Sequence, residues 1–75
     1  MTTSRAGILL RHARDLRHLS QRDVARMSGT TQSAISRIEN GASIPSFDRV
    51  IDVLATMGVS VDVQLEIVEV DEAAL

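Results

Sequence analysis

The chain has 75 residues and a formal net charge of −2, which is the size of one small domain. Apolar residues make up 44% of it, so it can bury a modest core and does not have the composition of a disordered segment. It contains no cysteine and no apolar run approaching ~18 residues, which excludes disulfides, thiol chemistry and a membrane-spanning helix.

Two helices are predicted in the first part of the chain. Apolar residues recur at three- and four-residue spacing from about residue 4 to 17, which predicts a first helix. Ser20 and Asp23 have the spacing of a capping box, in which the hydroxyl and the carboxylate each accept a hydrogen bond from a backbone N–H. They predict a short second helix, and Gly29 ends it because glycine can adopt the left-handed conformation.

A third helix is predicted between two further boundary signals. Thr31 is a good N-cap residue, and the helix runs from Gln32 to about Asn40. Gly41 ends this helix, since glycine takes positive φ without strain. The turn at residues 29–31 is therefore short and contains a glycine, which is the geometry of a helix-turn-helix. A plain αα-hairpin without any binding role has the same spacing.

A fourth helix starts near Ser46, because Pro45 disfavours helical geometry in the residue before it. Its apolar stripe begins with Phe47, the single aromatic residue, which we expect to anchor the core. Gly58 stops the helix. Met27, on the second helix, and Met57, on the fourth, are expected to fill the core in a similar way.

The segment from residue 59 to 67 alternates strictly between apolar and polar residues, which is the period of a half-buried β-strand. The apolar set is Val59, Val61, Val63, Leu65 and Ile67. No other segment predicts a strand, so this one has no mate within the chain for its backbone donors and acceptors.

Charge is distributed unevenly along the chain. Residues 1–40 carry seven arginines against three acidic residues, a net +4, and residues 41–75 carry one arginine against seven acidic residues, a net −6. A basic half on an acidic chain predicts a polyanion-binding face with the acidic part turned away. Ordinary solvated helix faces give the same counts, so charge alone does not distinguish a polyanion-binding face from a plain surface.

The segment LSQRDVARMSGTTQSAISRIENG, from Leu19 to Gly41, resembles the helix-turn-helix core of the Cro/C1-type (Xre) family of bacterial and phage DNA-binding proteins. The resemblance extends from about residue 4 to 58. It implies a mainly α fold, a four-helix lambda-repressor-like domain, in a protein that binds double-stranded DNA and associates with the nucleoid when bound. The absence of cysteine, of a membrane span and of a signal-peptide pattern predicts a cytoplasmic protein. No cofactor and no metal are implied.

The resemblance also implies roles for individual residues. DNA base contacts fall on Gln32, Ser33, Ser36 and Arg37, which point away from the apolar face of the third helix. DNA phosphate contacts fall on Gln21, Arg22, Thr31, Asn40 and Ser43. Arg14 and Glu39 match a pair that forms an internal, structural salt bridge. The loop at residues 42–45 has no basic residue, unlike that of many family members, so its phosphate contacts should be weak.

A second copy of the chain is the simplest partner for the predicted strand, pairing antiparallel across a two-fold axis. The strand could instead pair with an edge strand of another protein or with a missing domain of a longer parent. A dimer would present two third helices to half-sites about one helical turn (~34 Å) apart. We therefore expect a DNA-binding domain at 1–58, a dimerisation strand at 59–70, with the apolar set at the interface, and an acidic tail at 71–75.

Residues 53–67 resemble antitoxins of type II toxin–antitoxin operons, which repress their own operon and bind a toxin. The sequence thus predicts a homodimeric repressor with a toxin protein as a possible partner. A stand-alone regulator and a protein-interaction module with the same fold are the alternatives. An enzyme is not expected, because His12 and His18 lack metal-ligand spacing and no glycine-rich phosphate loop is present.

Overall fold

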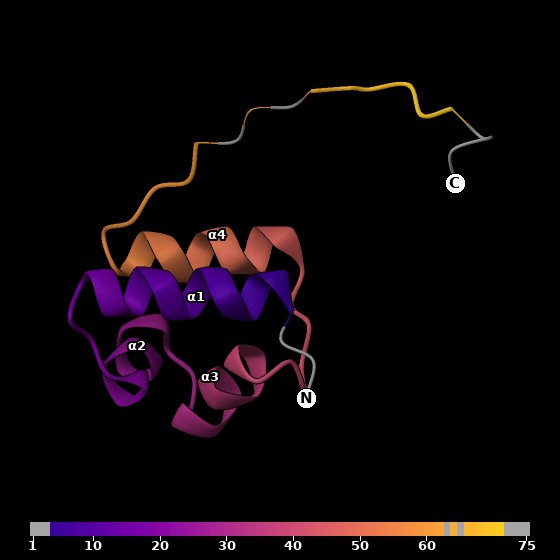
Figure 1. The fold of residues 1–75 in the computed structure, drawn as a ribbon. Coiled ribbons are helices and arrows are strands. Elements are labelled where there is room, and N and C mark those ends of the chain that lie inside the picture. Colours follow the sequence, from indigo (N-terminus) through magenta and orange to yellow (C-terminus); the bar gives the residue numbers. More distant parts are fainter. Residues whose placement is uncertain (1–3, 63, 65, 72–75) are drawn as a thin grey trace.

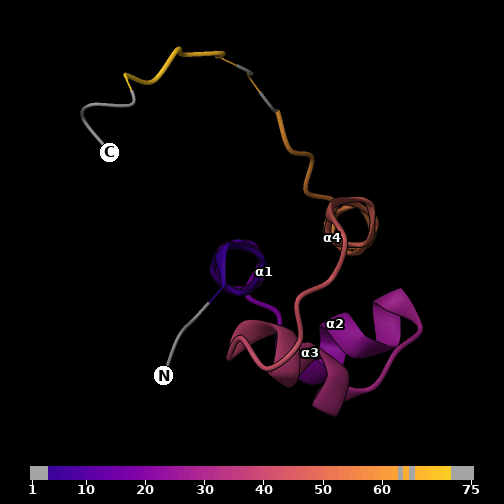
Figure 2. The ribbon, with the colours of Figure 1, turned by 90° about the vertical axis from the view of Figure 1, so that its right-hand side faces the viewer.

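The computed structural model describes residues 4–62, 64 and 66–71, which form four α-helices. They are α1 (Arg5–Leu16), α2 (Gln21–Ser28), α3 (Gln32–Glu39) and α4 (Phe47–Thr56). α1 and α4 lie side by side with nearly parallel axes, and in Figure 1 α2 and α3 pack against them from below. Figure 2 shows the same arrangement along the axes of α1 and α4. The predicted mainly α fold with four helices is confirmed. None of the described helices is long and apolar enough to cross a membrane.

Each helix begins at a hydroxyl side chain that accepts a hydrogen bond from the backbone N–H three residues ahead. These N-cap residues are Ser4, Ser20, Thr31 and Ser46. The capping box is present as predicted: the Asp23 carboxylate accepts from the Ser20 N–H at 2.9 Å, and the Ser20 hydroxyl accepts from the Asp23 N–H at 3.0 Å. Helices this short are unstable in isolation, so the caps and the packing between helices hold them.

The helix ends mostly follow the glycine signals. Gly29 has φ 70° at the end of α2, and Gly58 has φ 75° just after α4, both in the left-handed region. After α1 there is no glycine, and the left-handed residue is His18, with φ 57°. The nearby Leu19 N–H donates to the Arg14 carbonyl at 2.9 Å and closes this turn. A histidine with positive φ is strained, and its position was not evident from the sequence.

The core is formed by residues of all four helices and by Met57, the C-cap residue of α4; the full set is Leu10, Ala13, Val24, Ala25, Ile35, Val50, Val53, Leu54 and Met57. Two predictions about this core are wrong. Phe47 is 63% exposed, because burial on α4 starts one turn later, at Val50. Met27 is 41% exposed, because α2 buries only Val24 and Ala25.

Gly7 brings α1 against the end of α3. A Cβ atom at this position would lie 2.5 Å from the carbonyl oxygen of Ile38 and 2.9 Å from that of Glu39. Real side chains do not approach backbone oxygen atoms so closely. The absence of a side chain at Gly7 therefore sets how closely α1 approaches the last turn of α3.

The predicted strand is not formed in the single chain. None of residues 59–62, 64 and 66–71 is in a β-strand, and Val63 and Leu65 lie outside the described residues. Val59 and Val61 pack, half-buried, against the chain's own core, whereas Ile67 is 89% exposed on a segment that extends away from the helices (Figure 1). A strand needs a neighbour for its ladder of hydrogen bonds, and the described part of one chain offers none.

Candidate nucleic-acid interface

α2, the turn at residues 29–31 and α3 form the helix-turn-helix unit. The turn is fixed by the left-handed Gly29 and by a hydrogen bond of 2.9 Å from the Thr30 N–H to the Ala25 carbonyl. α3 buries Ile35 completely and packs Ile38 against the core. Its opposite side is therefore free to present polar side chains to solvent or to a ligand.

Five polar side chains line one open hollow, of about 460 Å³, between the start of α2 and α3. They are Gln21, Gln32, Ser33, Ser36 and Arg37. We call this site the α2–α3 hollow. The structure thus brings the four predicted base-contacting residues together with Gln21. One arginine and no acidic side chain line the hollow, so its chemistry suits the acceptor-rich edges of bases and the phosphates beside them.

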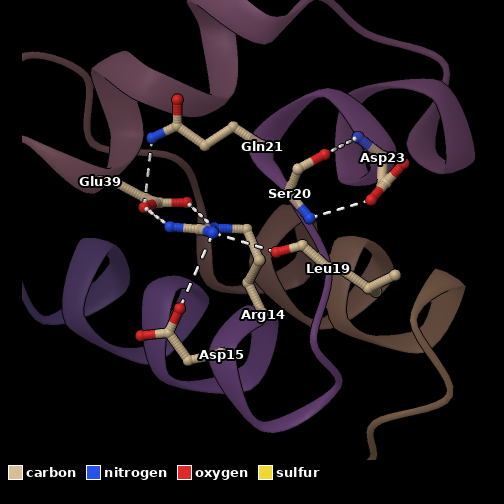
Figure 3. A network of polar contacts seen from close by, with 7 residues as sticks. All are labelled: Arg14, Asp15, Leu19, Ser20, Gln21, Asp23 and Glu39. Carbon is tan, nitrogen blue, oxygen red and sulfur yellow. Dashed lines mark hydrogen bonds and ion pairs between the residues drawn. The ribbon is translucent and has the colours of Figure 1, made fainter.

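A buried ion pair lies behind this surface (Figure 3). Arg14 Nε donates to Glu39 Oε2, and Arg14 Nη2 donates to Glu39 Oε1, both at 2.9 Å. Arg14 Nη1 also donates to the Leu19 carbonyl at 3.0 Å. The hydrogen bonds with Glu39 raise the pKa of Arg14 above its ordinary value. Arg14 therefore joins α1 to the last residue of α3, the structural role that the resemblance implies.

Gln21 connects this ion pair to the surface. Its Nε2 donates to Glu39 Oε1 at 3.3 Å (Figure 3). This bond fixes which way the amide faces and uses one of its two N–H groups. The second N–H is suited to a phosphate oxygen, which accepts hydrogen bonds only. The predicted phosphate contact and the buried ion pair are thus parts of one hydrogen-bonded network.

Thr31 and Asn40 lie at the two ends of α3 and use their side-chain oxygens internally. The Thr31 hydroxyl accepts from the Ala34 N–H at 3.1 Å, and Asn40 Oδ1 accepts from the Ala42 N–H at 3.0 Å. These bonds use acceptors and leave the hydroxyl hydrogen and the amide N–H groups as donors. Both residues are exposed, so each presents a donor suited to a phosphate.

Arg22 and Ser43, the other two predicted phosphate contacts, do not line the α2–α3 hollow. Arg22 is exposed on α2 directly after Gln21. Ser43 lies in the loop after α3, where its N–H donates to the Arg37 carbonyl at 3.0 Å. This bond folds the loop back along the last turn of α3.

Sequence reasoning assigned no role to Arg49, in the first turn of α4. Its side chain lines a second groove, of about 350 Å³, whose other polar lining residues are Thr30, Arg37 and Ser43. We call this the α3–α4 groove. Arg49 is the only arginine in the acidic second half of the chain, which was the one signal in the sequence that could have marked it.

Comparison with known proteins agrees with this geometry. A helix-turn-helix family model matches residues 10–64, which is more than half of the chain and includes the whole of α2, α3 and α4. No curated protein and no solved structure matches the chain significantly. The chain belongs to the Cro/C1-type helix-turn-helix family, a family of DNA-binding transcription regulators.

Proposed function

We propose that this protein is a transcriptional repressor that binds a palindromic operator as a homodimer, with α3 in the major groove. The observation that supports this most directly is the α2–α3 hollow, because it gathers hydrogen-bonding side chains from α3 and the start of α2 without any acidic group. Phosphates repel carboxylates, so a surface of this composition favours a nucleic acid over a cationic partner.

In this proposal the residues on the exposed face of α3 specify the sequence. Arg37 donates two hydrogen bonds to a guanine edge, and Gln32 pairs with an adenine edge. Ser33 and Ser36 contact neighbouring bases. Phosphate contacts fix the position of α3 along the groove, and they come from Gln21, Arg22, Thr31, Asn40 and Ser43. The Arg14–Glu39 pair holds α3 and Gln21 in one fixed arrangement.

The dimer in this proposal forms through residues 59–70, which we call the extended tail. Ile67, which belongs to the predicted interface and is exposed in the single chain, gains cover when two tails pair antiparallel. The start of the tail is held on the chain's own core, because the Val59 N–H donates to the Leu54 carbonyl at 3.0 Å. A tail anchored at one end and paired at the other would set the spacing between the two α3 helices, and hence between half-sites.

An antitoxin role is a second candidate, supported by the resemblance of residues 53–67 to antitoxins and by the exposed Ile67 at the end of that segment. In that case the protein also binds a toxin and represses the operon that encodes both. The test is whether a toxin encoded next to this gene binds the purified protein. A neighbouring region without a toxin-sized reading frame would favour a stand-alone regulator.

Titration of fluorescent duplex DNA with the purified protein tests the main proposal. We expect binding of two chains to one palindromic duplex, with an affinity that falls steeply as salt rises. A chain that binds no duplex even at low salt would instead be a protein-interaction module with a helix-turn-helix fold.

A further inference from the structure

The α3–α4 groove lies directly beside the α2–α3 hollow, because the Arg37 side chain lines both. Its polar lining residues are two arginines, Arg37 and Arg49, and two hydroxyl-bearing residues, Thr30 and Ser43. No carboxylate lines it. Polar residues therefore continue from the start of α2 past Arg37 to the first turn of α4, along a groove that is otherwise apolar.

Among the described residues, neither arginine in this groove has an acidic partner in an ion pair. In the part of the chain that the structure describes, ion pairs engage Arg14 and Arg26 but neither Arg37 nor Arg49. Asp48 and Asp52 lie on the same helix as Arg49 and form no ion pair with it. Two like charges that share one groove repel each other, so an anion bound between or beside them is favoured.

We infer that Arg49 binds a backbone phosphate of the DNA duplex whose bases α3 contacts. The inference rests on the proposed function and adds a contact from α4 that the sequence did not indicate. The loop at residues 42–45 has no basic residue. The bond from the Ser43 N–H to the Arg37 carbonyl folds this loop back along α3, and Arg49 supplies a cation in the groove beside it.

A phosphate is the expected ligand for Arg49, and a base is not. Arg49 belongs to α4, not to the helix placed in the major groove, and the rest of its groove is apolar, with Ile35, Pro45 and Val53 among the lining residues. An apolar wall excludes water and strengthens a charge-assisted hydrogen bond. The planar guanidinium can donate two parallel hydrogen bonds to one phosphate, which lysine cannot do.

The test compares Arg49→Ala with the parent chain on two duplexes, one selected for tight binding and one with the same base composition in scrambled order. Affinity is measured over a range of salt concentrations. We expect Arg49→Ala to weaken binding to both duplexes by the same factor. The slope of log affinity against log salt should become shallower by about 0.9 per bound chain, because one phosphate contact is lost.

Arg11→Ala is the matched control, since it also removes one exposed arginine, from α1, that forms no ion pair with any described residue and lines neither the hollow nor the groove. It should leave the slope unchanged. Arg49→Lys should keep the slope and lose part of the affinity, as a point charge replaces a two-bond contact. Because the replaced arginines are exposed, all variants should melt at the temperature of the parent.

If Arg49→Ala binds both duplexes with the parent's affinity and slope, the inference is wrong while the proposed function stands. A loss confined to the selected duplex would also overturn it, because it would indicate a base contact. A parent chain without salt-dependent DNA binding would remove both the inference and the proposed function.

Discussion

Arg14 on α1 and Glu39 on α3 are joined by two hydrogen bonds of 2.9 Å, one to each carboxylate oxygen. The side chain of Glu39 is only 6% exposed and that of Arg14 only 15%. Two parallel bonds restrict both distance and orientation, so the pair fixes the end of α3 relative to α1. Since Glu39 also accepts a bond from Gln21, the same carboxylate orients a residue on the candidate DNA-binding surface.

The first prediction concerns this pair. Arg14→Ala should lower the free energy of unfolding by about 3–5 kcal/mol, because it leaves the buried Glu39 carboxylate without its cation. Urea denaturation measures this loss. Arg11→Ala, an exposed change on the same helix, should cost little. The double variant Arg14→Met with Glu39→Leu should recover much of the stability, and a fully stable Arg14→Ala would show that the pair is not a brace.

The second prediction concerns Gly7. Replacing a glycine inside a helix with alanine usually stabilises it by about 1 kcal/mol. Here the added Cβ would meet the Ile38 and Glu39 carbonyl oxygens, so Gly7→Ala should instead destabilise the protein by about 1–3 kcal/mol. Thermal unfolding followed by circular dichroism gives the sign directly. A higher melting temperature for Gly7→Ala would mean that α1 and α3 are not in close contact.

The third prediction concerns pH. The hydrogen bond from the Ser20 backbone N–H, helped by the Ser20 hydroxyl, lowers the pKa of Asp23 below its ordinary value of 3.8. Because the folded state favours the ionised carboxylate, Asp23 stabilises the protein above pH 3.8. This stabilisation is lost as the pH falls through the pKa that Asp23 has in the folded state.

Asp23→Ala should therefore reduce the melting temperature at neutral pH, and the difference from the parent should shrink steadily below pH 3.8. Asp52→Ala, which removes an exposed carboxylate from α4, controls for the general loss of a negative charge. A difference between Asp23→Ala and the parent that stays constant down to the most acidic conditions would mean that the charged capping box contributes nothing.

The fourth prediction concerns the tail. Ile67→Arg should raise the dissociation constant of the dimer at least tenfold, equal to about 1.4 kcal/mol, because two charges would enter the paired apolar face. Ile67 is 89% exposed in the single chain, so the change should not disturb the helical fold. Gln64→Arg adds the same charge on the opposite face of the alternation and should leave the dimer intact. Sedimentation equilibrium showing dimers of unaltered affinity for Ile67→Arg would contradict pairing through this segment.

The parts of the fold that follow from local signals could be predicted from the sequence. Ser20 with Asp23 and Gly29 each act within one helical turn, so residue spacing was enough to place the ends of α2. Burial at helix ends depends on where the other helices lie, and this is why Phe47 was placed wrongly in the core. The strand required a neighbour, which a single sequence does not supply.

In the candidate site too, features within one helix could be predicted and contacts between helices could not. The exposed face of α3 was predictable, because helical periodicity separates Gln32, Ser33 and Arg37 from the buried Ile35. The bond from Gln21 to Glu39 and the shared groove of Arg37 and Arg49 bring together residues on different helices. Such pairs depend on how helices pack, and spacing within one helix does not reveal them.

The central claim is that the exposed face of α3 specifies a DNA sequence. Selection from a pool of random duplexes, with the parent chain and with Arg37→Ala and Gln21→Ala, tests it most directly. The parent should enrich a palindrome. Arg37→Ala should lose about 1–3 kcal/mol of preference at one position in each half-site, while Gln21→Ala should enrich the same palindrome with lower affinity. If the parent enriches no sequence, or if Arg37→Ala enriches the parent's palindrome with undiminished preference, then α3 does not contact the bases as proposed.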